Sequence, residues 1–249
     1  MSIFFNNIFI SLNFKIKPGQ LVAVVGEVGS GKSSLLYSIQ NEMHKFRGKI
    51  NVNGTLAVVP QQAWIQNATV RENILFGLSY NDLFYKETVD LCGIKSDFVQ
   101  LAAGDQTEIG EKGANLSGGQ KQRISLSRAV YSDADIYLLD DPLSNVDSKV
   151  GKKIYESVIG PKGILNKKTR IFVTNTFSNL NECDQIILID QGTIVEMGTY
   201  EYLVEKSQLF NQLIKNTVQQ KSKSIYILFN TIFNSKLDVY FKIIFYIVS

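Results

Sequence analysis

The stretch Gly26-Glu-Val-Gly-Ser-Gly-Lys-Ser-Ser34 directly follows the apolar run Leu21-Val-Ala-Val-Val25. A strand, a glycine-rich turn and a helix in this order are the expected setting of the pattern Gly-x-x-x-x-Gly-Lys-Ser. Glycine leaves the backbone free to curl round an anion, and the N–H groups of the turn and of the next helix then face that anion. We therefore predict an α/β core with a phosphate-binding loop between a buried strand and a helix.

The residue types in this loop predict a triphosphate with Mg²⁺ as the ligand. Lys32 is expected to reach the β- and γ-phosphates, and the Ser33 hydroxyl is expected to hold Mg²⁺. A chance glycine-rich turn is the competing interpretation, and the flanking strand and helix argue against it. The predicted nucleotide-binding residues of the loop are Gly26, Glu27, Val28, Gly29, Ser30, Gly31, Lys32, Ser33 and Ser34.

Two carboxylates end a second apolar run, Ile136-Tyr-Leu-Leu-Asp140-Asp141. Ligands of open α/β sheets bind at the carboxyl ends of the strands, so this pair is expected beside the phosphate loop. Asp140 is the predicted Mg²⁺ partner, and Asp141, which points differently, is predicted to address the attacking water. A solvated Asp-Asp-Pro turn is the alternative for such a pair when it stands alone.

The order of four motifs then resembles the nucleotide-binding domain of an ABC transporter, over roughly residues 8–215. The motifs are the phosphate loop, Leu116-Ser-Gly-Gly-Gln-Lys-Gln-Arg123, the Asp140-Asp141 strand end and Ser144-Asn-Val-Asp147. Two more segments resemble the glutamine loop of the multidrug-resistance-associated (C) subfamily, Val58-Val-Pro-Gln-Gln-Ala-Trp-Ile-Gln66 and Val70-Arg-Glu-Asn-Ile-Leu-Phe-Gly77. Thr107-Glu-Ile-Gly-Glu-Lys-Gly113 is similar to the exporter loop that touches membrane domains, and the Asp-Asp pair is typical of the first of the two domains in that subfamily.

This resemblance implies a P-loop NTPase core with a mixed sheet, an antiparallel β subdomain and a helical lobe that carries the signature. It implies two such domains bound head to tail, with each ATP held by the phosphate loop of one domain and the signature of the other. Gln61 resembles the glutamine that senses Mg²⁺ and couples to the transmembrane helices, and its spacing from Trp64 favours it over Gln62. Asp147 resembles a contact between the two domains. The implied signature residues are Leu116, Ser117, Gly118, Gly119 and Gln120.

Three departures from the family pattern predict weak hydrolysis at this chain's own site. Asp141 stands where the catalytic base is usually Glu, and Asn175 stands where the family has a switch histidine; the only histidine, His44, is expected at the surface. A misplacement of about 1 Å can cost on the order of a hundredfold in rate, and an amide cannot carry a proton charge. The third departure is the aromatic residue that stacks on adenine, for which Phe4 and Phe5 are poorly placed candidates. We expect ATP to bind here and turn over slowly, with residues 116–120 completing a partner's site.

Composition restricts the class of protein. The chain has 249 residues, is 45% hydrophobic and carries a net charge of +3, which gives no argument for a nucleic-acid partner. Cys92 and Cys183 lack metal-ligand spacing and are expected to be reduced, partly buried thiols. The sequence contains no run of about 18 apolar residues, so we expect a cytosolic piece or a truncated product. Its expected place is the cytoplasmic face of a membrane, with the transmembrane domains of an exporter supplied in trans.

Local patterns divide the chain into an ATP-binding domain over residues 1–217 and a linker and tail over 218–249. Strands are predicted within 1–25 and 48–60, helices within 70–103 and from Ser117 to Val130, and the Asn53-Gly54 pair as a hairpin turn. Further predicted elements are a helix over Lys149–Val158, strands at Arg170–Thr174, Gln185–Asp190 and Thr193–Glu196, and a helix capped by Thr199. The tail over residues 225–249 fits three interpretations: a helix on a membrane surface, a packed tail, or non-native sequence from a misread frame, which we favour.

Two rival functions remain beside the exporter domain. One is a soluble ABC ATPase that works on ribosomes or DNA, and the lack of basic inserts or long helical arms argues against it. The other is an ATP-binding fragment that moves nothing, which Asp141, Asn175 and the missing membrane helices leave open. The transported substrate cannot be predicted, because the membrane helices that select it are not in this sequence.

Overall fold

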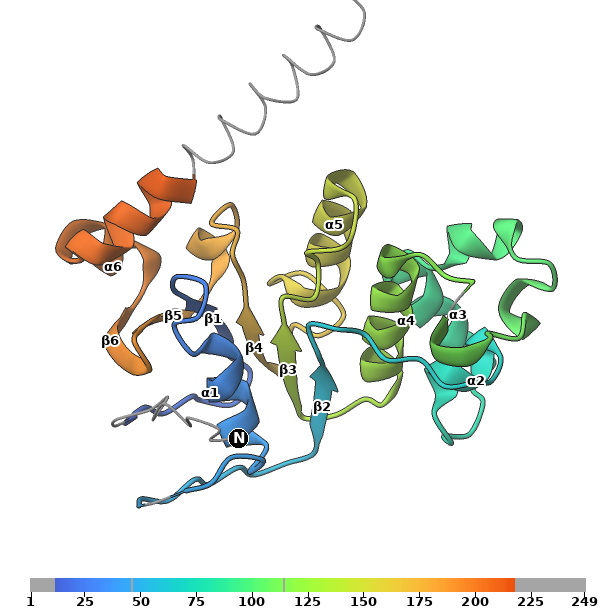
Figure 1. Ribbon diagram of the computed structural model, residues 1–249, viewed down its shortest axis with the longest axis horizontal. Coiled ribbons are helices and arrows are strands. Elements are labelled where there is room, and N and C mark those ends of the chain that lie inside the picture. Colours follow the sequence, from blue (N-terminus) through green and yellow to red (C-terminus); the bar gives the residue numbers. More distant parts are fainter. Residues whose placement is uncertain (1–11, 46, 114, 218–249) are drawn as a thin grey trace, which may run out of the picture.

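The computed structural model describes residues 12–45, 47–113 and 115–217. Within them lies a six-stranded sheet of order β2-β3-β4-β1-β5-β6 (Figure 1), in which β6 runs antiparallel to β5 and the other neighbours are parallel. The predicted fold class is therefore confirmed. The strands are β1 Leu21–Val25, β2 Leu56–Val59, β3 Ile136–Asp140, β4 Thr169–Val173, β5 Gln185–Asp190 and β6 Thr193–Gly198.

Strand β1, near the middle of the sheet, is apolar along its whole length, and both of its faces are covered. All five residues of β1 are buried, as expected for a parallel strand covered on both sides. Alternate residues enter separate clusters: Ala23 and Val25 join the core on one face, and Val22 and Val24 join the core on the other. The end of β1 is thereby held firmly, and the phosphate loop begins at that end.

Helices surround the sheet and form a lobe beside it. The α-helices include α1 Lys32–Ile39, α2 Val70–Leu75, α3 Asp82–Leu91, α4 Gly118–Tyr131, α5 Ser148–Ile154 and α6 Tyr200–Lys206, and the described residues 208–217 are also helical. The short 3-10 segments are η1 Lys95–Gln100, η2 Gly104–Gln106, η3 Glu111–Gly113 and η5 Leu180–Glu182, and a π-helical turn, η4 Tyr155–Ile159, extends α5. Figure 1 shows α2, α3 and α4 together at the β2 end of the sheet. This helical lobe has its own core, which includes Val70, Ile74, Val89, Ile109 and Ile124.

The helix boundaries follow local chemistry. Thr69 caps α2 and Ser117 caps α4, each in a capping box closed by the residue three positions later. Thr199 caps α6 as predicted, through its hydroxyl and the Tyr202 N–H. Gly77 and Gly93 interrupt the helical region with positive φ angles of 86° and 70°, which agrees with their prediction as breaks.

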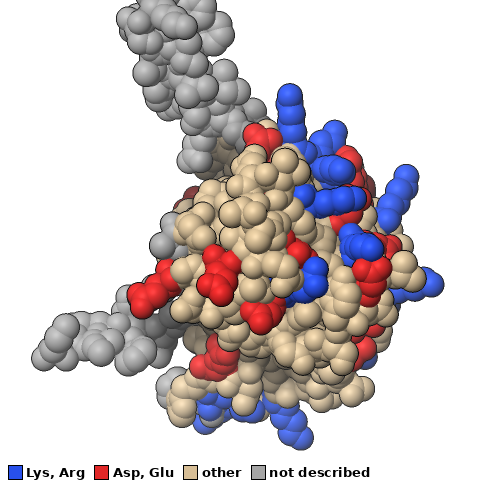
Figure 2. Space-filling view, turned by 90° about the vertical axis from the view of Figure 1, so that its right-hand side faces the viewer, with Lys and Arg blue, Asp and Glu red and all other residues tan. Residues whose placement is uncertain are grey.

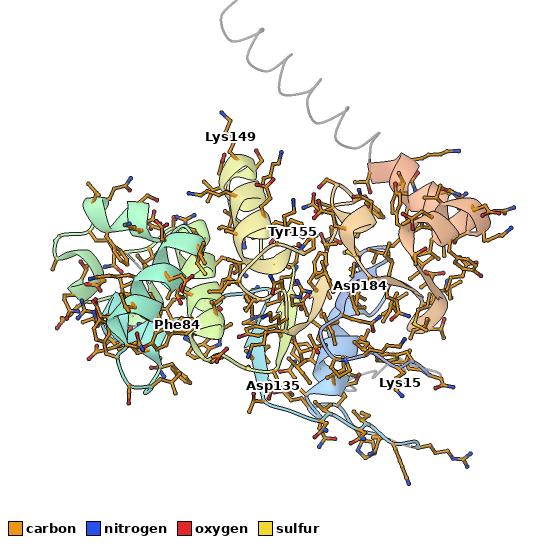
Figure 3. All side chains as sticks on the ribbon, turned by 180° about the vertical axis from the view of Figure 1, so that it is seen from behind. Lys15, Phe84, Asp135, Lys149, Tyr155 and Asp184 are labelled. Atoms are coloured by element: carbon orange, nitrogen blue, oxygen red, sulfur yellow. The ribbon has the colours of Figure 1, made fainter. Side chains whose placement is uncertain are left out.

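Two predicted strands are wrong within the described residues. Residues 12–17 form no strand, although Leu12, Phe14 and Ile16 pack on the core under the sheet; their alternation reflects burial and not strand pairing. Residues 48–55 also form no strand, and the Asn53-Gly54 pair is not a hairpin turn. Instead the Thr55 hydroxyl and N–H donate to Asp135 Oδ2, each at 2.8 Å, and fix the entry into β2. Asp135, which directly precedes β3, is labelled in Figure 3.

Within the described residues, the antiparallel pairing in the sheet is that of β5 with β6. The separate antiparallel β subdomain that the resemblance implies is therefore not seen in this part of the chain. The segments 1–11 and 218–249, with the adenine-stacking candidates Phe4 and Phe5 and the predicted tail, lie outside the described residues, and the domain boundary at 217 stays a prediction. None of the described helices is both long enough and apolar enough to cross a membrane. Cys92 and Cys183 are free and buried, and burial raises the pKa of each thiol to about 12, in agreement with inert reduced thiols.

Candidate functional site

The parallel register brings four chain segments to one edge of the sheet. Val59 of β2 lies opposite Leu139 of β3, and Asp140 lies opposite Val173 of β4. Val24 of β1 also lies opposite Val173. The residues that follow these strands therefore leave the same edge within two positions of one another. They are the phosphate loop from Gly26, Gln61, Asp141 and Asn175.

Glycine is required where the phosphate loop begins. A Cβ on Gly26 would lie 2.1 Å from the Ile189 carbonyl oxygen and 2.6 Å from Ser30 Oγ, so a side chain does not fit there. Gly29 and Gly31 have φ angles of 85° and 103°, which other residues rarely adopt. The Ser30 hydroxyl is buried and has no hydrogen-bond partner among the described residues. The loop is thus a narrow backbone cradle with an unused polar group inside it.

Lys32 lies inside this cradle. Its Nζ donates hydrogen bonds to the carbonyl oxygens of Gly26 at 2.8 Å and of Glu27 at 2.7 Å. Burial lowers the pKa of Lys32, and the negative charges of Asp141, Asp140 and Glu27 oppose that shift. The ammonium group is thereby held at the start of the loop, on the side of the two carboxylates.

The two carboxylates differ in surroundings. Burial raises the pKa of Asp140, against a hydrogen bond from Ser33 and the charge of Lys32. Burial also raises the pKa of Asp141, and the charge of Asp140 adds to that rise, while a hydrogen bond from Asn175 lowers it. The Asn175 amide Nδ2 donates this bond to Asp141 Oδ2 at 3.0 Å. Asp141 and Asn175, two of the three departures from the resembled pattern, are therefore in direct contact.

Asp141 has a φ angle of 46°, in the left-handed region that few side-chain-bearing residues adopt. Its N–H still donates to the Val173 carbonyl, so β3 remains paired with β4 up to the turn. After this turn the Asp141 carboxylate accepts the hydrogen bond from Asn175. Both Asp141 and Asn175 line a hollow of about 360 Å³ at this edge, together with apolar side chains that include Leu143 and Phe172.

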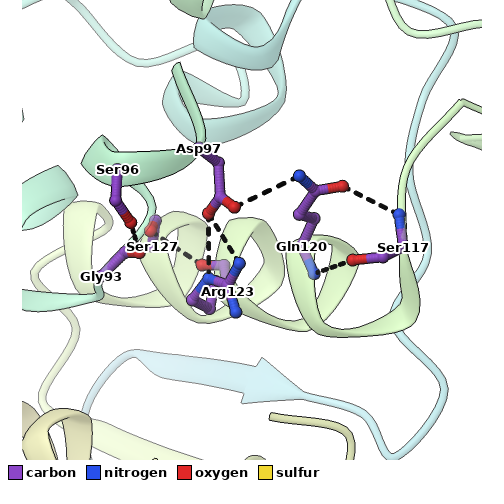
Figure 4. A network of polar contacts seen from close by, with 7 residues as sticks. All are labelled: Gly93, Ser96, Asp97, Ser117, Gln120, Arg123 and Ser127. Atoms are coloured by element: carbon purple, nitrogen blue, oxygen red, sulfur yellow. Dashed lines mark hydrogen bonds and ion pairs between the residues drawn. The ribbon is translucent and has the colours of Figure 1, made fainter. Parts of the chain in front are cut away.

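The signature residues lie elsewhere, at the start of α4 in the helical lobe. The Ser117 hydroxyl accepts from the Gln120 N–H, and Gln120 Oε1 accepts from the Ser117 N–H at 2.9 Å. Gln120 Nε2 also donates to Asp97 of η1, and Arg123 Nη2 donates to the same carboxylate at 2.6 Å (Figure 4). The side chains of the signature are thus bonded to each other and to η1, whereas Ser117 and Gly118 remain exposed.

The signature also contacts the segment that follows the two carboxylates. A Cβ on Gly119 would lie 2.9 Å from the Asn145 carbonyl oxygen, so the backbone of α4 approaches this segment closely. Asp147, which the resemblance implies as a contact between two domains, caps α5 in this chain: its Oδ1 accepts from the N–H groups of Lys149 and Val150. Cap and contact are separate roles, and the second remains a prediction.

Comparison with known proteins decides the family. The family model described as "ABC transporter" matches residues 9–144, which is more than half of the chain. The chain belongs to the ABC transporter family. It is 55% identical over 199 residues to ATP-binding cassette sub-family C member 2 of Rattus norvegicus and 53% identical over 206 residues to sub-family C member 3 of Homo sapiens. These matches cover 80% and 83% of the chain but only 13% and 14% of the relatives, so the chain spans about one seventh of their length.

The predicted membership of the C subfamily is therefore confirmed, and the domain is an ATPase of the ABC type. The residues of this ABC domain fit Mg²⁺ with ATP: the Gly26 cradle has no room for a side chain, and a buried hydroxyl inside it lacks a partner. Lys32, Ser33 and Asp140 supply the cation, hydroxyl and carboxylate that such a ligand needs. His44 is exposed in the segment between α1 and β2, as predicted for a surface residue.

Sequence reasoning missed the residues of the ABC domain that hold the signature and the glutamine loop in place. Asp97 anchors Gln120 from 23 residues away, and Arg128 contacts Trp64 from 64 residues away. Neither spacing belongs to a local motif, so no sequence pattern predicted these two contacts. The capping box between Ser117 and Gln120 did have a signal, since Ser-x-x-Gln before an apolar run is its usual form.

Proposed function

We propose that this domain binds Mg²⁺–ATP at its own phosphate loop, hydrolyses it slowly, and lends its signature to the nucleotide site of a second domain in an exporter. The contact between Asn175 and Asp141 carries the proposal. Asp and Asn at these two positions are both unsuited to fast hydrolysis, and they are in contact. The phosphate loop beside them still has the residues that would bind ATP.

Binding rests on groups for the phosphates and groups for the metal. The loop N–H groups and Lys32 hold the phosphates, and Lys32 exchanges its bonds to the Gly26 and Glu27 carbonyls for phosphate oxygens. Ser33, Asp140 and Gln61 hold the metal. When bound, Mg²⁺ neutralises the charge of the terminal phosphates and fixes their geometry.

Slow hydrolysis is expected from the short side chain of Asp141 and from the amide of Asn175, which carries no proton charge. The Asp141 side chain is one methylene shorter than the Glu usual in the family, so its carboxylate would reach less far toward an attacking water. One of its oxygens accepts from the Asn175 amide. Asn175 donates a hydrogen bond but cannot take up a proton, so it stabilises the carboxylate without switching charge.

A second ABC domain, bound head to tail, is the proposed partner of the signature. Support comes from the free end of α4: Ser117 and Gly118 are exposed, and the fourteen-residue helix directs its unsatisfied N–H groups outward. The residue types and the order of the motifs favour the first of the two domains of a C-subfamily exporter. The proposed ATP-binding domain is residues 1–217, and residues 218–249 are a linker and tail.

The transmembrane domains of the exporter are the other proposed partner, which places this domain at the cytoplasmic face of a membrane. Support comes from large apolar side chains exposed on the helical lobe: Phe76, Leu78, Leu83 and Val99 are between 48% and 89% exposed. Figure 2 shows the face of this lobe, where acidic and basic side chains border an uncharged area. Such a surface suits a protein partner better than a polyanion.

The test is the ATP turnover of the full chain, measured for the wild type and for Asp141→Glu combined with Asn175→His. We expect slow wild-type turnover and a rise on the order of tenfold or more in the double variant, since small gains in placement have large effects on rate. Lys32→Ala is the control that removes activity from either form. Brisk wild-type turnover that Asp141→Asn leaves unchanged would contradict the proposal.

A further inference from the structure

The glutamine loop, residues 58–66, is held by α4 on both sides of Gln61. Before Gln61, Gln122 Nε2 donates to the Pro60 carbonyl at 3.3 Å; after it, Arg128 Nη1 donates to the Trp64 carbonyl at 3.3 Å. The two α4 residues are six positions apart, about 9 Å along the helix axis, so the loop lies across α4 between two anchors.

The second anchor is much larger than one hydrogen bond. The Arg128 guanidinium lies over the Trp64 ring, with Cζ 3.7 Å from the ring centroid, and also lies near the Phe76 ring. Its Nε donates to the Asn73 carbonyl at 2.7 Å and its Nη2 to Asn73 Oδ1 at 3.1 Å. Arg128 therefore joins α4 to α2 and to Trp64 of the glutamine loop.

Arg128 is a costly residue for a purely structural purpose. It is only 8% exposed, and its contacts within the described part of the chain include no carboxylate. A buried charge without a counter-ion is expensive, and an apolar side chain of similar volume usually packs as well. Burial lowers the pKa of Arg128 to about 10, so it stays charged at neutral pH. The guanidinium donates to the Trp64 carbonyl and to Asn73 while it stacks on the Trp64 ring, which no apolar side chain can do.

The same helix begins at the signature. Ser117 caps α4, and Gln120 and Arg123 tie its first turns to Asp97 (Figure 4). One rigid element thus carries the signature at its start and both anchors of the glutamine loop further along. The carbonyl groups of Pro60 and Trp64, on either side of Gln61, are therefore bonded to the helix that begins at the signature.

We propose that Gln122 and Arg128 are positioning residues that fix Gln61 to the signature helix, so that engagement of the signature by a partner is transmitted to the metal side of this chain's own site. This inference rests on the proposed metal-binding role of Gln61. It assigns no direct contact with nucleotide to either residue: both act through the glutamine loop.

The chain contains its own reporter, because Trp64 is its only tryptophan. Intrinsic fluorescence therefore observes the stack with Arg128 directly, three residues from Gln61. The experiment compares acrylamide quenching of Trp64 in the full-length wild type, Arg128→Met and Arg128→Lys, first without nucleotide. Arg128→Met keeps most of the apolar volume and loses every donor; Arg128→Lys keeps the charge and one donor group.

The matched control is Arg123→Met. It is the same change on the same helix, at a residue whose side chain is 12% exposed and bonded to Asp97 on η1. A general loosening of α4 would act in both variants. We expect Arg128→Met to raise the quenching constant of Trp64 about twofold or more, as a side chain released from a packed contact becomes open to solvent. Arg128→Lys is expected to recover part of that change, and Arg123→Met is expected to leave Trp64 unchanged.

The second stage adds ATP with Mg²⁺ or with EDTA and measures affinity by calorimetry and by the Trp64 signal. We expect Arg128→Met to reduce the gain in affinity that Mg²⁺ provides and to have no further effect in a Gln61→Ala background, as a double-mutant cycle requires for residues that act through one another. Quenching equal to the wild type, an equal change in Arg123→Met, or additive effects with Gln61→Ala would each overturn the inference. A wild type that binds no ATP by calorimetry would instead refute the proposed function, while the first-stage comparison would still decide whether Arg128 anchors the loop.

Discussion

The phosphate-loop edge and the signature are both polar sites, yet their side chains are satisfied in opposite ways. At the sheet edge, Ser30 Oγ has no partner among the described residues, and burial raises the pKa values of Asp140 and Asp141. At the signature, Ser117 and Gln120 bond to each other and Asp97 bonds to Arg123. The sheet edge thus has a buried hydroxyl without a hydrogen-bond partner, whereas the signature side chains are paired within the chain.

The difference indicates two kinds of binding. A buried hydroxyl without a partner, such as that of Ser30, gains free energy when a ligand satisfies it, which supports the proposal that the phosphate loop receives the nucleotide. A site whose side chains are already paired cannot gain in that way and offers its backbone instead. This arrangement supports the proposal that the signature presents the end of α4 to a nucleotide held by another domain.

The largest expected effect is that of Lys32→Ala on nucleotide affinity. The ammonium group lies in the cradle with its donors directed at the Gly26 and Glu27 carbonyls. Charge-assisted contacts are worth about 1.5–3 kcal/mol each, so the loss of two or more lowers affinity about 100-fold or more. Thermal stabilisation by Mg²⁺–ATP should disappear with it.

The control for this variant is Lys149→Ala. Lys149 is exposed near the start of α5, and Figure 3 shows its side chain directed away from the body of the protein. It should retain the wild-type shift in melting temperature. A normal Mg²⁺–ATP shift in Lys32→Ala would mean that the phosphate loop is not the ligand site.

The next effect is on the signature's own network. Asp97→Ala should lower the free energy of unfolding by about 3–5 kcal/mol, because it leaves the Arg123 charge buried without its partner; the side chains of this pair are 10% and 12% exposed. Asp90→Ala removes an ion pair with Lys95 that is 3.5 Å long and largely exposed, so it should cost less than about 1 kcal/mol. Urea denaturation measures both. Equal losses would show that the signature is not held by this network.

The two signature glycines sharpen the comparison further. A Cβ on Gly118 would have 3.9 Å to its nearest neighbour, whereas one on Gly119 would lie 2.9 Å from the Asn145 carbonyl oxygen. Alanine is favoured over glycine in a helix by about 0.5–1 kcal/mol, so Gly118→Ala should stabilise the chain by that amount. Gly119→Ala should destabilise it by about 1 kcal/mol or more, because the clash exceeds the helical gain. If both variants melt above the wild type, the close approach of α4 to residue 145 is not maintained in solution.

The smallest effect is the pH dependence of the metal-free protein. The pKa of Asp141 is raised from 3.8 in the folded state, first by burial and then by the charge of Asp140. The native state then binds more protons than the unfolded state above pH 3.8, so stability falls as the pH rises through the folded pKa. In EDTA, Asp141→Asn should raise the melting temperature at pH 7 and flatten this decline.

Asp135 supplies a control of opposite sign. Hydrogen bonds from Thr55 lower its pKa from 3.8, so its contribution to stability is present above that value and is lost as the pH falls. Asp135→Asn should therefore lower the melting temperature at pH 7. If the melting temperature of Asp141→Asn also falls at pH 7, burial of the charged Asp141 carboxylate does not destabilise the folded state.

The local features of both sites were predictable from the sequence. The strand before Gly26, the turn after Asp140 and the start of α4 at Ser117 depend on residues within a few positions of one another. Parallel register then brings strand ends together without further information. This is why the two carboxylates were correctly expected beside the phosphate loop.

What remained hidden depends on contacts between distant segments. The bond of Gln120 to Asp97 and that of Arg128 to Trp64 arise from the packing of the helical lobe, which local propensity does not encode. The alternation over residues 12–16 likewise indicated burial correctly and strand pairing wrongly. Pairing needs a neighbouring strand, and hydrophobic periodicity reports only which side faces the core.

The most direct test of the central claim is the identity of the nucleotide that the chain retains. The purified protein is incubated with Mg²⁺–ATP for several minutes, separated from free nucleotide, denatured and analysed by chromatography. The account predicts close to one nucleotide per chain, present as ATP, and none with Lys32→Ala. Recovery of ADP at the same stoichiometry would contradict slow hydrolysis, and recovery of no nucleotide would contradict binding at the phosphate loop.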